Sequence, residues 1–224
     1  MPHPRVPYGG RTRVPRAPRP RRVCQAGKVD SLFGPDLPNG FAYREDFISP
    51  DEERALVDSI SGIEFANFEM RGAVAKRRVA FFGLSYDDTR QAIGEMPAFL
   101  DDVRIRAARW AEVKPEDFVM ALINEYRPGA PIGWHRDAPQ YGIVVGVSML
   151  TGARMKLRRY LPPSQRSEPR RTTHEIHLEP RSAYLIAGEA RQSYEHSIPP
   201  AESLRYSLTF RTLRDRAARS TSVP

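Results

Sequence analysis

Two segments in the first half of the chain place apolar residues at helical spacing. The first opens with Ser49-Pro50-Asp51-Glu52, which has the composition of a helix start: a serine N-cap, a proline at the first helical position and acidic side chains near the positive end of the helix dipole. Apolar residues then recur at positions 55, 56, 60 and 63, which predicts a helix with one buried face. A second helix is predicted from Pro97 to Trp110, with Phe99, Leu100, Val103 and Ala107 buried.

After Pro115 the pattern changes to short β-type segments separated by proline, glycine and polar clusters. The segments predicted to be strands are 118–126, 142–150, 153–160, 172–178, 182–187 and 204–212. Residues 41–48 and 76–86 also have extended character. Short strands at this spacing are typical of a sandwich or jelly roll, and no repeat suggests a solenoid or propeller. We therefore expect a mainly β protein with flanking helices, of the α+β class.

The net charge of +8 is concentrated at the N-terminus. Residues 1–28 hold seven arginines, one lysine, six prolines and no acidic residue. Subtracting these eight positive charges from +8 leaves residues 29–224 with a formal charge near zero. A segment with so few large apolar side chains cannot offset its ordering entropy, so we interpret it as a disordered tail. It is either merely solvated or an arm that attracts phosphate backbones.

Other features of the sequence narrow the class of protein. No apolar run approaches the roughly 18 residues of a membrane span, and no secretory signal is recognisable. Cys24 is the single cysteine, so no internal disulfide can form. We expect a cytoplasmic protein without a membrane partner, and a monomer by default.

The tetrapeptide Trp134-His135-Arg136-Asp137 is the most informative local feature. In an extended backbone, residues two apart face the same way, so His135 and Asp137 can reach one point, while Trp134 points away and is assigned to the core. A neutral imidazole and a carboxylate supply two of the three ligands in the facial triad of non-haem iron. Taken alone, this short motif also fits a surface loop.

The third ligand must come from another strand, and three histidines are candidates. His196 lies just after a predicted strand and a turn at Gly188, 59 residues beyond Asp137. A jelly roll can bring it back to the first two ligands. His174 and His177 share one predicted strand and, three residues apart, lie on opposite faces. Either of them stays open as an alternative.

The last predicted strand alternates polar and apolar positions from residue 205 to 211. One face carries Arg205, Ser207, Thr209 and Arg211, and the other carries Tyr206, Leu208 and Phe210. An exposed strand would show the same pattern. If the polar face is buried beside a metal, its arginines would bind a dicarboxylate through bidentate hydrogen bonds.

Together these motifs resemble the ordered signature of AlkB-type iron(II)- and 2-oxoglutarate-dependent dioxygenases. The resemblance covers residues 118–213 and extends weakly back to about residue 40. It implies a double-stranded β-helix (jelly roll) that holds iron(II) between His135, Asp137 and His196, with 2-oxoglutarate and O2 as the other reactants. The residues matching positions that bind 2-oxoglutarate are Asn124, Tyr126, Arg205, Ser207 and Arg211. Serine at 207 departs from the usual asparagine.

The resemblance also implies a division of the chain and a set of substrate contacts. We expect a disordered tail (1–29), a supporting and substrate-covering region (30–117), the catalytic jelly roll (118–214) and a flexible C-terminus (215–224). The expected substrate-binding residues are Arg78, Phe82, Tyr86 and Tyr141, with Phe81 as a further stacking candidate. After Asp137, the sequence Ala138-Pro139-Gln140-Tyr141 lacks the acidic residue that some DNA-repair members carry.

The function implied is oxidative demethylation of N-alkylated nucleobases in single-stranded DNA or RNA, as in DNA repair, with release of formaldehyde. Two alternatives remain open. The same oxygenase chemistry could act on a protein or a small molecule, which the near-neutral charge of residues 29–224 favours. A nucleic-acid-binding protein with a vestigial metal site is the other, and the complete set of ligands argues against it.

Overall fold

The computed structural model describes residues 37–70, 73–84, 92–162, 164 and 172–214. The predicted N-terminal tail (1–29) and C-terminal segment (215–224) lie outside these ranges. The expected fold class is confirmed, because the described residues form two antiparallel sheets with few helices. None of the described helices is both long enough and apolar enough to cross a membrane.

The larger sheet has the strand order β1-β10-β7-β12-β5-β3-β2, with β4 paired to β3. Its strands are β1 (Phe41–Arg44), β2 (Ala66–Met70), β3 (Ala73–Leu84), β4 (Ala92–Gly94), β5 (Phe118–Tyr126), β7 (Tyr141–Met149), β10 (Ala183–Ile186) and β12 (Arg205–Leu213). The smaller sheet, in the order β6-β11-β8-β9, contains β6 (Ile132–His135), β8 (Ala153–Arg159), β9 (Thr173–Leu178) and β11 (Tyr194–Ile198). Because residues 78–83 of β3 pair with residues 120–125 of β5, the sheet continues across the boundary expected at residue 117.

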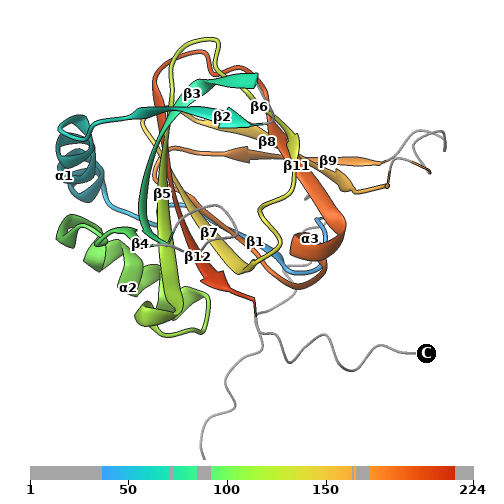
Figure 1. The fold of residues 1–224 in the computed structure, drawn as a ribbon, viewed down its shortest axis with the longest axis horizontal. Helices are drawn as coiled ribbons and strands as arrows, with labels where there is room; N and C mark the ends of the chain where they lie inside the picture. Colours follow the sequence, from blue (N-terminus) through green and yellow to red (C-terminus); the bar gives the residue numbers. More distant parts are fainter. Residues whose placement is uncertain (1–36, 71–72, 85–91, 163, 165–171, 215–224) are drawn as a thin grey trace, which may run out of the picture. The chain divides into compact units, whose positions relative to one another are not determined.

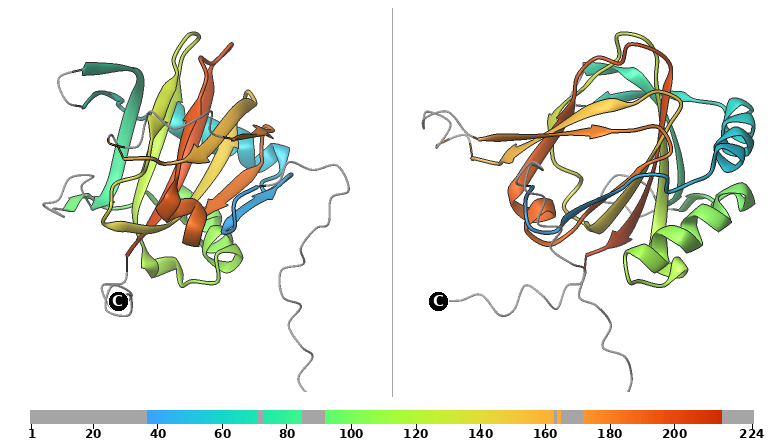
Figure 2. Two further views of the ribbon diagram at one scale, coloured as in Figure 1. Left: turned by 90° about the vertical axis from the view of Figure 1, so that its right-hand side faces the viewer. Right: turned by 180° about the vertical axis from the view of Figure 1, so that it is seen from behind.

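Helices α1 (Pro50–Ser61) and α2 (Asp101–Trp110) lie together on one side of the larger sheet, as Figures 1 and 2 show. Leu56 and Ile60 of α1 pack with Val103 and Ala107 of α2 in the same core cluster as Leu208 and Phe210 of β12. A short helix, α3 (Gly188–Ser193), precedes β11, and 3-10 turns at Ala98–Leu100 and Pro115–Asp117 precede α2 and β5.

The start of α1 has the predicted chemistry. The Ser49 side chain accepts a hydrogen bond from the Glu52 amide (3.1 Å), and the Glu52 carboxylate accepts one from the Ser49 amide (2.7 Å). Arg106 of α2 pairs with the same carboxylate and donates to the Phe47 carbonyl (2.7 Å). The cap therefore also ties α1 to α2.

Strand β12 separates the helical core from the space between the two sheets. Leu208 and Phe210 belong to the core beneath the helices. The opposite face carries polar side chains, and every one of them is buried: Arg205, Ser207, Thr209 and Arg211. Buried polar groups need partners, and this face therefore indicates where a polar ligand would bind.

We predict that Ser49→Ala destabilises the protein by about 1 kcal/mol, the usual cost of losing a side-chain N-cap. Urea unfolding followed by circular dichroism would measure it. The matched control is Ser61→Ala at the other end of α1, where the exposed hydroxyl only donates to the Asp58 carbonyl. Equal losses in both variants would contradict a specific role for the cap.

Candidate functional site

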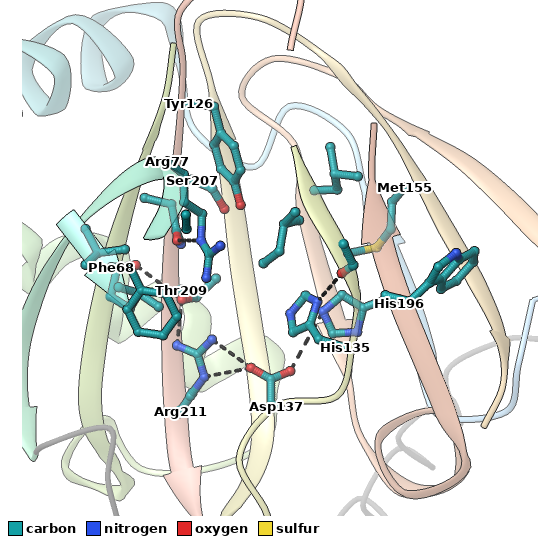
Figure 3. A pocket seen from close by; sticks show the side chains of 18 of the residues that line it. Phe68, Arg77, Tyr126, His135, Asp137, Met155, His196, Ser207, Thr209 and Arg211 are labelled. Atoms are coloured by element: carbon teal, nitrogen blue, oxygen red, sulfur yellow. Dashed lines mark hydrogen bonds and ion pairs between the residues drawn. The ribbon is translucent and has the colours of Figure 1, made fainter. Parts of the chain in front are cut away.

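A cavity of about 270 Å³ lies between the two sheets. Figure 3 shows His135, Asp137 and His196 at one side of it, and Tyr126, Arg77 and Ser207 toward the far end. Ligand pockets usually measure roughly 300–1,000 Å³, so this volume suits one small molecule, and a larger substrate could enter only in part. The lining comes from strands of both sheets: Phe68, Ala75, Arg77, Val79, Phe81, Leu122, Asn124, Tyr126, Ile132, Gly133, Trp134, His135, Asp137, Met155, Tyr184, His196, Ile198, Ser207, Thr209 and Arg211.

The structure brings His135, Asp137 and His196 together. His135 of β6 and His196 of β11 are register partners, and their ring centroids are 4.3 Å apart. The Nε2 atom of His196 lies 3.9 Å from Oδ2 of Asp137. His174 and His177 are not part of this cluster: they lie on β9, outside the cavity lining, and His177 is exposed beside Glu179.

The cluster is wider than an occupied metal site. Two ligand atoms at roughly 2.1 Å from one metal and at right angles to each other are roughly 3 Å apart. Within the described ranges, no three histidine, cysteine or acidic side chains already stand close enough to count as a metal cage. Binding would thus require the 3.9 Å separation between His196 and Asp137 to shorten by roughly 1 Å.

The protonation states suit a metal. Burial lowers the pKa of His196 to about 3 and also lowers the pKa of His135, so both rings are neutral near pH 7. Nδ1 of His135 faces the Gly133 carbonyl at 2.9 Å, which favours a proton on Nδ1 and leaves Nε2 to accept a metal. These are the ring states that metal coordination requires.

Asp137 is an ionised carboxylate in a buried position. Burial alone would raise its pKa, but the surrounding basic groups, among which Arg211 contributes most, together outweigh burial and hold the pKa of Asp137 well below its usual range. Both Nε (3.0 Å) and Nη2 (2.7 Å) of Arg211 donate to Oδ1 of Asp137, and Oδ2 is the oxygen that faces His196. Arg211 thereby orients the Asp137 carboxylate and also stabilises its ionised form.

Arg191 of α3, which the sequence analysis missed, binds the backbone of the segment that begins at Asp137. Its Nη2 atom lies within hydrogen-bonding distance of three carbonyls, those of Asp137 (3.2 Å), Ala138 (2.6 Å) and Tyr141 (3.0 Å). A buried guanidinium that binds backbone carbonyls holds the turn between β6 and β7. Sequence alone could not show this, because the contact joins segments more than 50 residues apart.

Most of the residues expected to bind the cosubstrate lie toward the other end of the cavity. Asn124, Tyr126 and Ser207 line it there, whereas Arg211 lines it next to Asp137. Arg205 lies behind them, fully buried, with its guanidinium carbon 5.1 Å from the centre of the Tyr126 ring. Nη2 of Arg205 donates to Ser148 Oγ (2.6 Å), whereas its Nε and Nη1 are buried without a hydrogen-bond partner. A bound carboxylate would satisfy such donors, so this end of the cavity fits a dicarboxylate.

Three of the expected substrate contacts are corrected by the structure, and one lies outside the described residues. Arg78 binds Glu125 (2.7 Å), and Phe82 packs against the helical core, so both lie on the face of β3 that points away from the cavity. Tyr141 is buried in the cluster behind the cavity wall, with Val79 and Met120, and is not part of the cavity lining. Tyr86 is outside the described ranges.

The physical reason for the first two corrections is strand parity. Val79 of β3 is the register partner of Asn124, which faces the cavity. Because side chains alternate, Arg77, Val79 and Phe81 face the cavity and their neighbours do not. The stacking candidate Phe81 therefore lines the cavity, as do Arg77 and Phe68, which the sequence analysis did not name. Trp134 is also corrected: it is half-buried, with the Arg158 guanidinium 3.9 Å above its ring.

Phe68, Phe81 and Arg77 form one wall of the cavity, which we call the aromatic wall. The rings of Phe68 and Phe81 are 6.0 Å apart, and the Arg77 guanidinium lies 4.7 Å from the Phe68 centroid. Nε of Arg77 also donates to Oδ1 of Asn124 (3.1 Å). A flat, apolar ligand could stack here and meet a cation at its edge.

Comparison with known proteins gives consistent matches. The family model described as the 2OG-Fe(II) oxygenase superfamily matches residues 45–211. The "Uncharacterized protein L905" of Acanthamoeba polyphaga mimivirus is 25% identical over 78% of this chain and 85% of its own. The tRNA (carboxymethyluridine(34)-5-O)-methyltransferase alkbh8 of Xenopus tropicalis is 25% identical over 77% of this chain, which spans only 27% of that protein. The Alkylated DNA repair protein ALKBH8 homolog of Arabidopsis thaliana is 24% identical over 69% of this chain and 49% of its own.

Two solved structures share the fold. OsALKBH1 superposes with a TM-score of 0.57 at 15% identity, covering 79% of this chain and 99% of that one. A prolyl-4-hydroxylase of Pseudomonas putida superposes with a TM-score of 0.52 at 16% identity, covering 78% and 93%. At these identities the likeness concerns the arrangement of the strands alone.

We predict that Arg211→Met makes metal binding depend on pH. With Arg211 present, Asp137 is ionised throughout the ordinary pH range. Without the largest of the contributions that oppose burial, the pKa of Asp137 rises, and at the lower pH a metal must displace a proton. Binding of manganese(II), measured by calorimetry, should weaken about tenfold at pH 6 and recover in part at pH 8. Arg127→Met, which removes an exposed arginine paired with Glu125, is the control. Unchanged affinity at both pH values would refute the role of Arg211.

Proposed function

Because the chain belongs to the 2OG-Fe(II) oxygenase superfamily, we propose that it removes alkyl groups oxidatively from the nitrogen atoms of nucleobases. The chain is an AlkB-type 2-oxoglutarate-dependent dioxygenase whose cofactors are iron(II), 2-oxoglutarate and O2. The observation that carries the proposal is that the aromatic wall and the His135, Asp137 and His196 cluster line the same cavity.

In this proposal, Nε2 of His135, Nε2 of His196 and Oδ2 of Asp137 hold the iron. When bound, iron(II) and 2-oxoglutarate supply the oxidation, in which O2 is consumed, 2-oxoglutarate becomes succinate and carbon dioxide, and a C–H bond of the substrate becomes C–OH. The chain itself contributes ligands, orientation and exclusion of water. The apolar lining residues, among them Val79, Leu122 and Ile198, keep the cavity poor in water.

The cosubstrate would lie along β12. Arg205 would bind the carboxylate remote from the keto group, because two of its buried nitrogen atoms have no hydrogen-bond partner and a carboxylate would accept from them. Tyr126, Asn124 and Ser207 would supply hydrogen bonds along the molecule, and Arg211 would lie near its other end, next to Asp137. These assignments follow the family resemblance, and the burial of the residues and the two unpaired nitrogen atoms of Arg205 support them.

The substrate would enter at the aromatic wall. Phe68 and Phe81 offer ring faces for a base, and Arg77 offers donors for its oxygen or nitrogen atoms. A base must leave its stack to reach a buried metal, so single-stranded or flipped-out nucleotides are favoured. The names of two relatives refer to a tRNA modification and to alkylated DNA repair, and they support nucleic acid as the substrate class. An N-hydroxymethyl product would release formaldehyde and leave the unmodified base.

We predict that the protein, supplied with iron(II), ascorbate and 2-oxoglutarate, removes the methyl group from 1-methyladenine in a single-stranded oligonucleotide. Mass spectrometry would follow the loss of one CH2 from the oligonucleotide. Asp137→Ala should abolish this loss and manganese(II) binding together, while its circular dichroism spectrum stays native. If the wild-type protein binds 2-oxoglutarate yet leaves methylated DNA and RNA oligonucleotides intact, nucleobases are not the substrate, and methylated peptides and small molecules become the next panel.

A second prediction uses the opposite faces of β3. Phe81→Leu should raise the KM for the oligonucleotide about tenfold, the magnitude expected for losing one stacking contact. Phe82→Leu makes the same chemical change one residue along, in the helical core, and should lower stability while leaving KM unchanged. Steady-state kinetics and thermal unfolding of both variants would measure this. A larger rise in KM for Phe82→Leu would show that the aromatic wall is not where the base stacks.

A further inference from the structure

Tyr184 of β10 lies across the inner face of the larger sheet. Its register partner on β7 is Gly146, and a Cβ atom at 146 would collide with Cζ and Cε1 of the Tyr184 ring. The glycine therefore leaves the space in which the ring crosses β7 toward β12. Gly146 pairs on its other side with Thr209, a residue of the polar cavity face.

The position of the ring places the phenol beside the cosubstrate residues. Gly146 and Ser148 are successive inward positions on β7, and Ser148 Oγ accepts the hydrogen bond from Arg205. Tyr184 is buried and lines the cavity. Its phenol interacts electrostatically with both Arg205 and Asp137. Its ring, over Gly146, therefore lies one inward position from Ser148, the residue that accepts the hydrogen bond from Arg205 at the end assigned to the remote carboxylate.

The Tyr184 hydroxyl has an unused hydrogen-bonding capacity. Within the part of the chain that the structure describes, it makes no hydrogen bond, and its one ring contact is the stacked Phe41 (6.3 Å). Burial raises the pKa of this phenol above its usual value, so it is protonated and can donate near pH 7. Because Tyr184 lines the cavity, a ligand bound there can accept a hydrogen bond from this hydroxyl.

We propose that Tyr184 is a further cosubstrate-binding residue: its hydroxyl donates to the remote carboxylate of 2-oxoglutarate, and its ring limits the length of the 2-oxo acid that fits. This inference rests on the cosubstrate site proposed above. The carboxylate then meets Arg205 and the phenol together, and Gly146 is required because any side chain there displaces the ring.

The test is calorimetric titration of 2-oxoglutarate into the manganese(II)-loaded protein. Tyr184→Phe removes one hydrogen bond to a charged group and should raise the Kd about tenfold. The matched control is Tyr43→Phe on the neighbouring strand, where Tyr43 is the register partner of Tyr184 but its hydroxyl accepts from the Glu179 amide. Tyr43→Phe should leave the Kd within twofold of wild type. An unchanged Kd in Tyr184→Phe would overturn the hydrogen bond.

Two more variants test the ring. Tyr184→Leu opens the end of the cavity, so its preference for 2-oxoglutarate over the one-carbon-longer 2-oxoadipate should fall about tenfold. Gly146→Ala should weaken 2-oxoglutarate binding in the wild-type background and have little effect beside Tyr184→Leu, since the collision is then removed. A preference that does not change in Tyr184→Leu would overturn the role in chain length.

Arg205→Met separates failure of this inference from failure of the proposed site. If Arg205→Met loses 2-oxoglutarate binding while Tyr184→Phe keeps it, the cosubstrate site stands and the role of Tyr184 is refuted. If Arg205→Met also binds normally, the cosubstrate lies elsewhere and both assignments fall.

Discussion

The buried ion pair between Arg211 and Asp137 is the interaction on which the rest of the site depends. Both side chains are almost inaccessible, and the two contacts from Arg211 end on the same carboxylate oxygen. Separating such a pair leaves one charge buried and costs roughly 3–5 kcal/mol. That constraint joins β12, which carries Arg211, to the turn after β6, which carries Asp137, and so joins the two sheets at the point where the metal ligands meet.

A second constraint is the alternation of side chains along the central strands. On β12 the odd-numbered positions from Arg205 to Arg211 face the cavity and the even-numbered ones pack beneath the helices. On β3 the same alternation directs the Arg77 side chain into the cavity, whereas Arg78 lies on the opposite face and pairs with Glu125. A slip of one residue would exchange the two sets. The helical core and the cavity thus stabilise the same register, because each satisfies one face of the same strands.

This explains what the sequence could and could not predict. Six of the strands from 118 onward, the Ser49 cap and the polar face of β12 follow local patterns, and the structure contains all of them. The short strands β6 and β11, which carry His135 and His196, were not predicted as strands. The face of β3 does not follow locally, since it depends on which residue of β3 pairs with Asn124 of β5. Tyr184 was missed for a related reason. Within the apolar run 182–187 it is indistinguishable from core, and only its pairing with Gly146 reveals its position.

The two halves of the cavity differ in how firmly the fold holds them. Arg205, Ser207 and Arg211 lie on β12, which is bonded on both sides by β5 and β7. Phe68 lies on β2, the last strand of the sheet order, with a partner on one side only. Substitutions on an edge strand disturb fewer neighbours than those on a central strand. The residues proposed to bind the metal and the cosubstrate therefore lie at the centre of the fold, whereas the proposed substrate wall extends to its edge strand, where Phe68 can change with little disturbance of them.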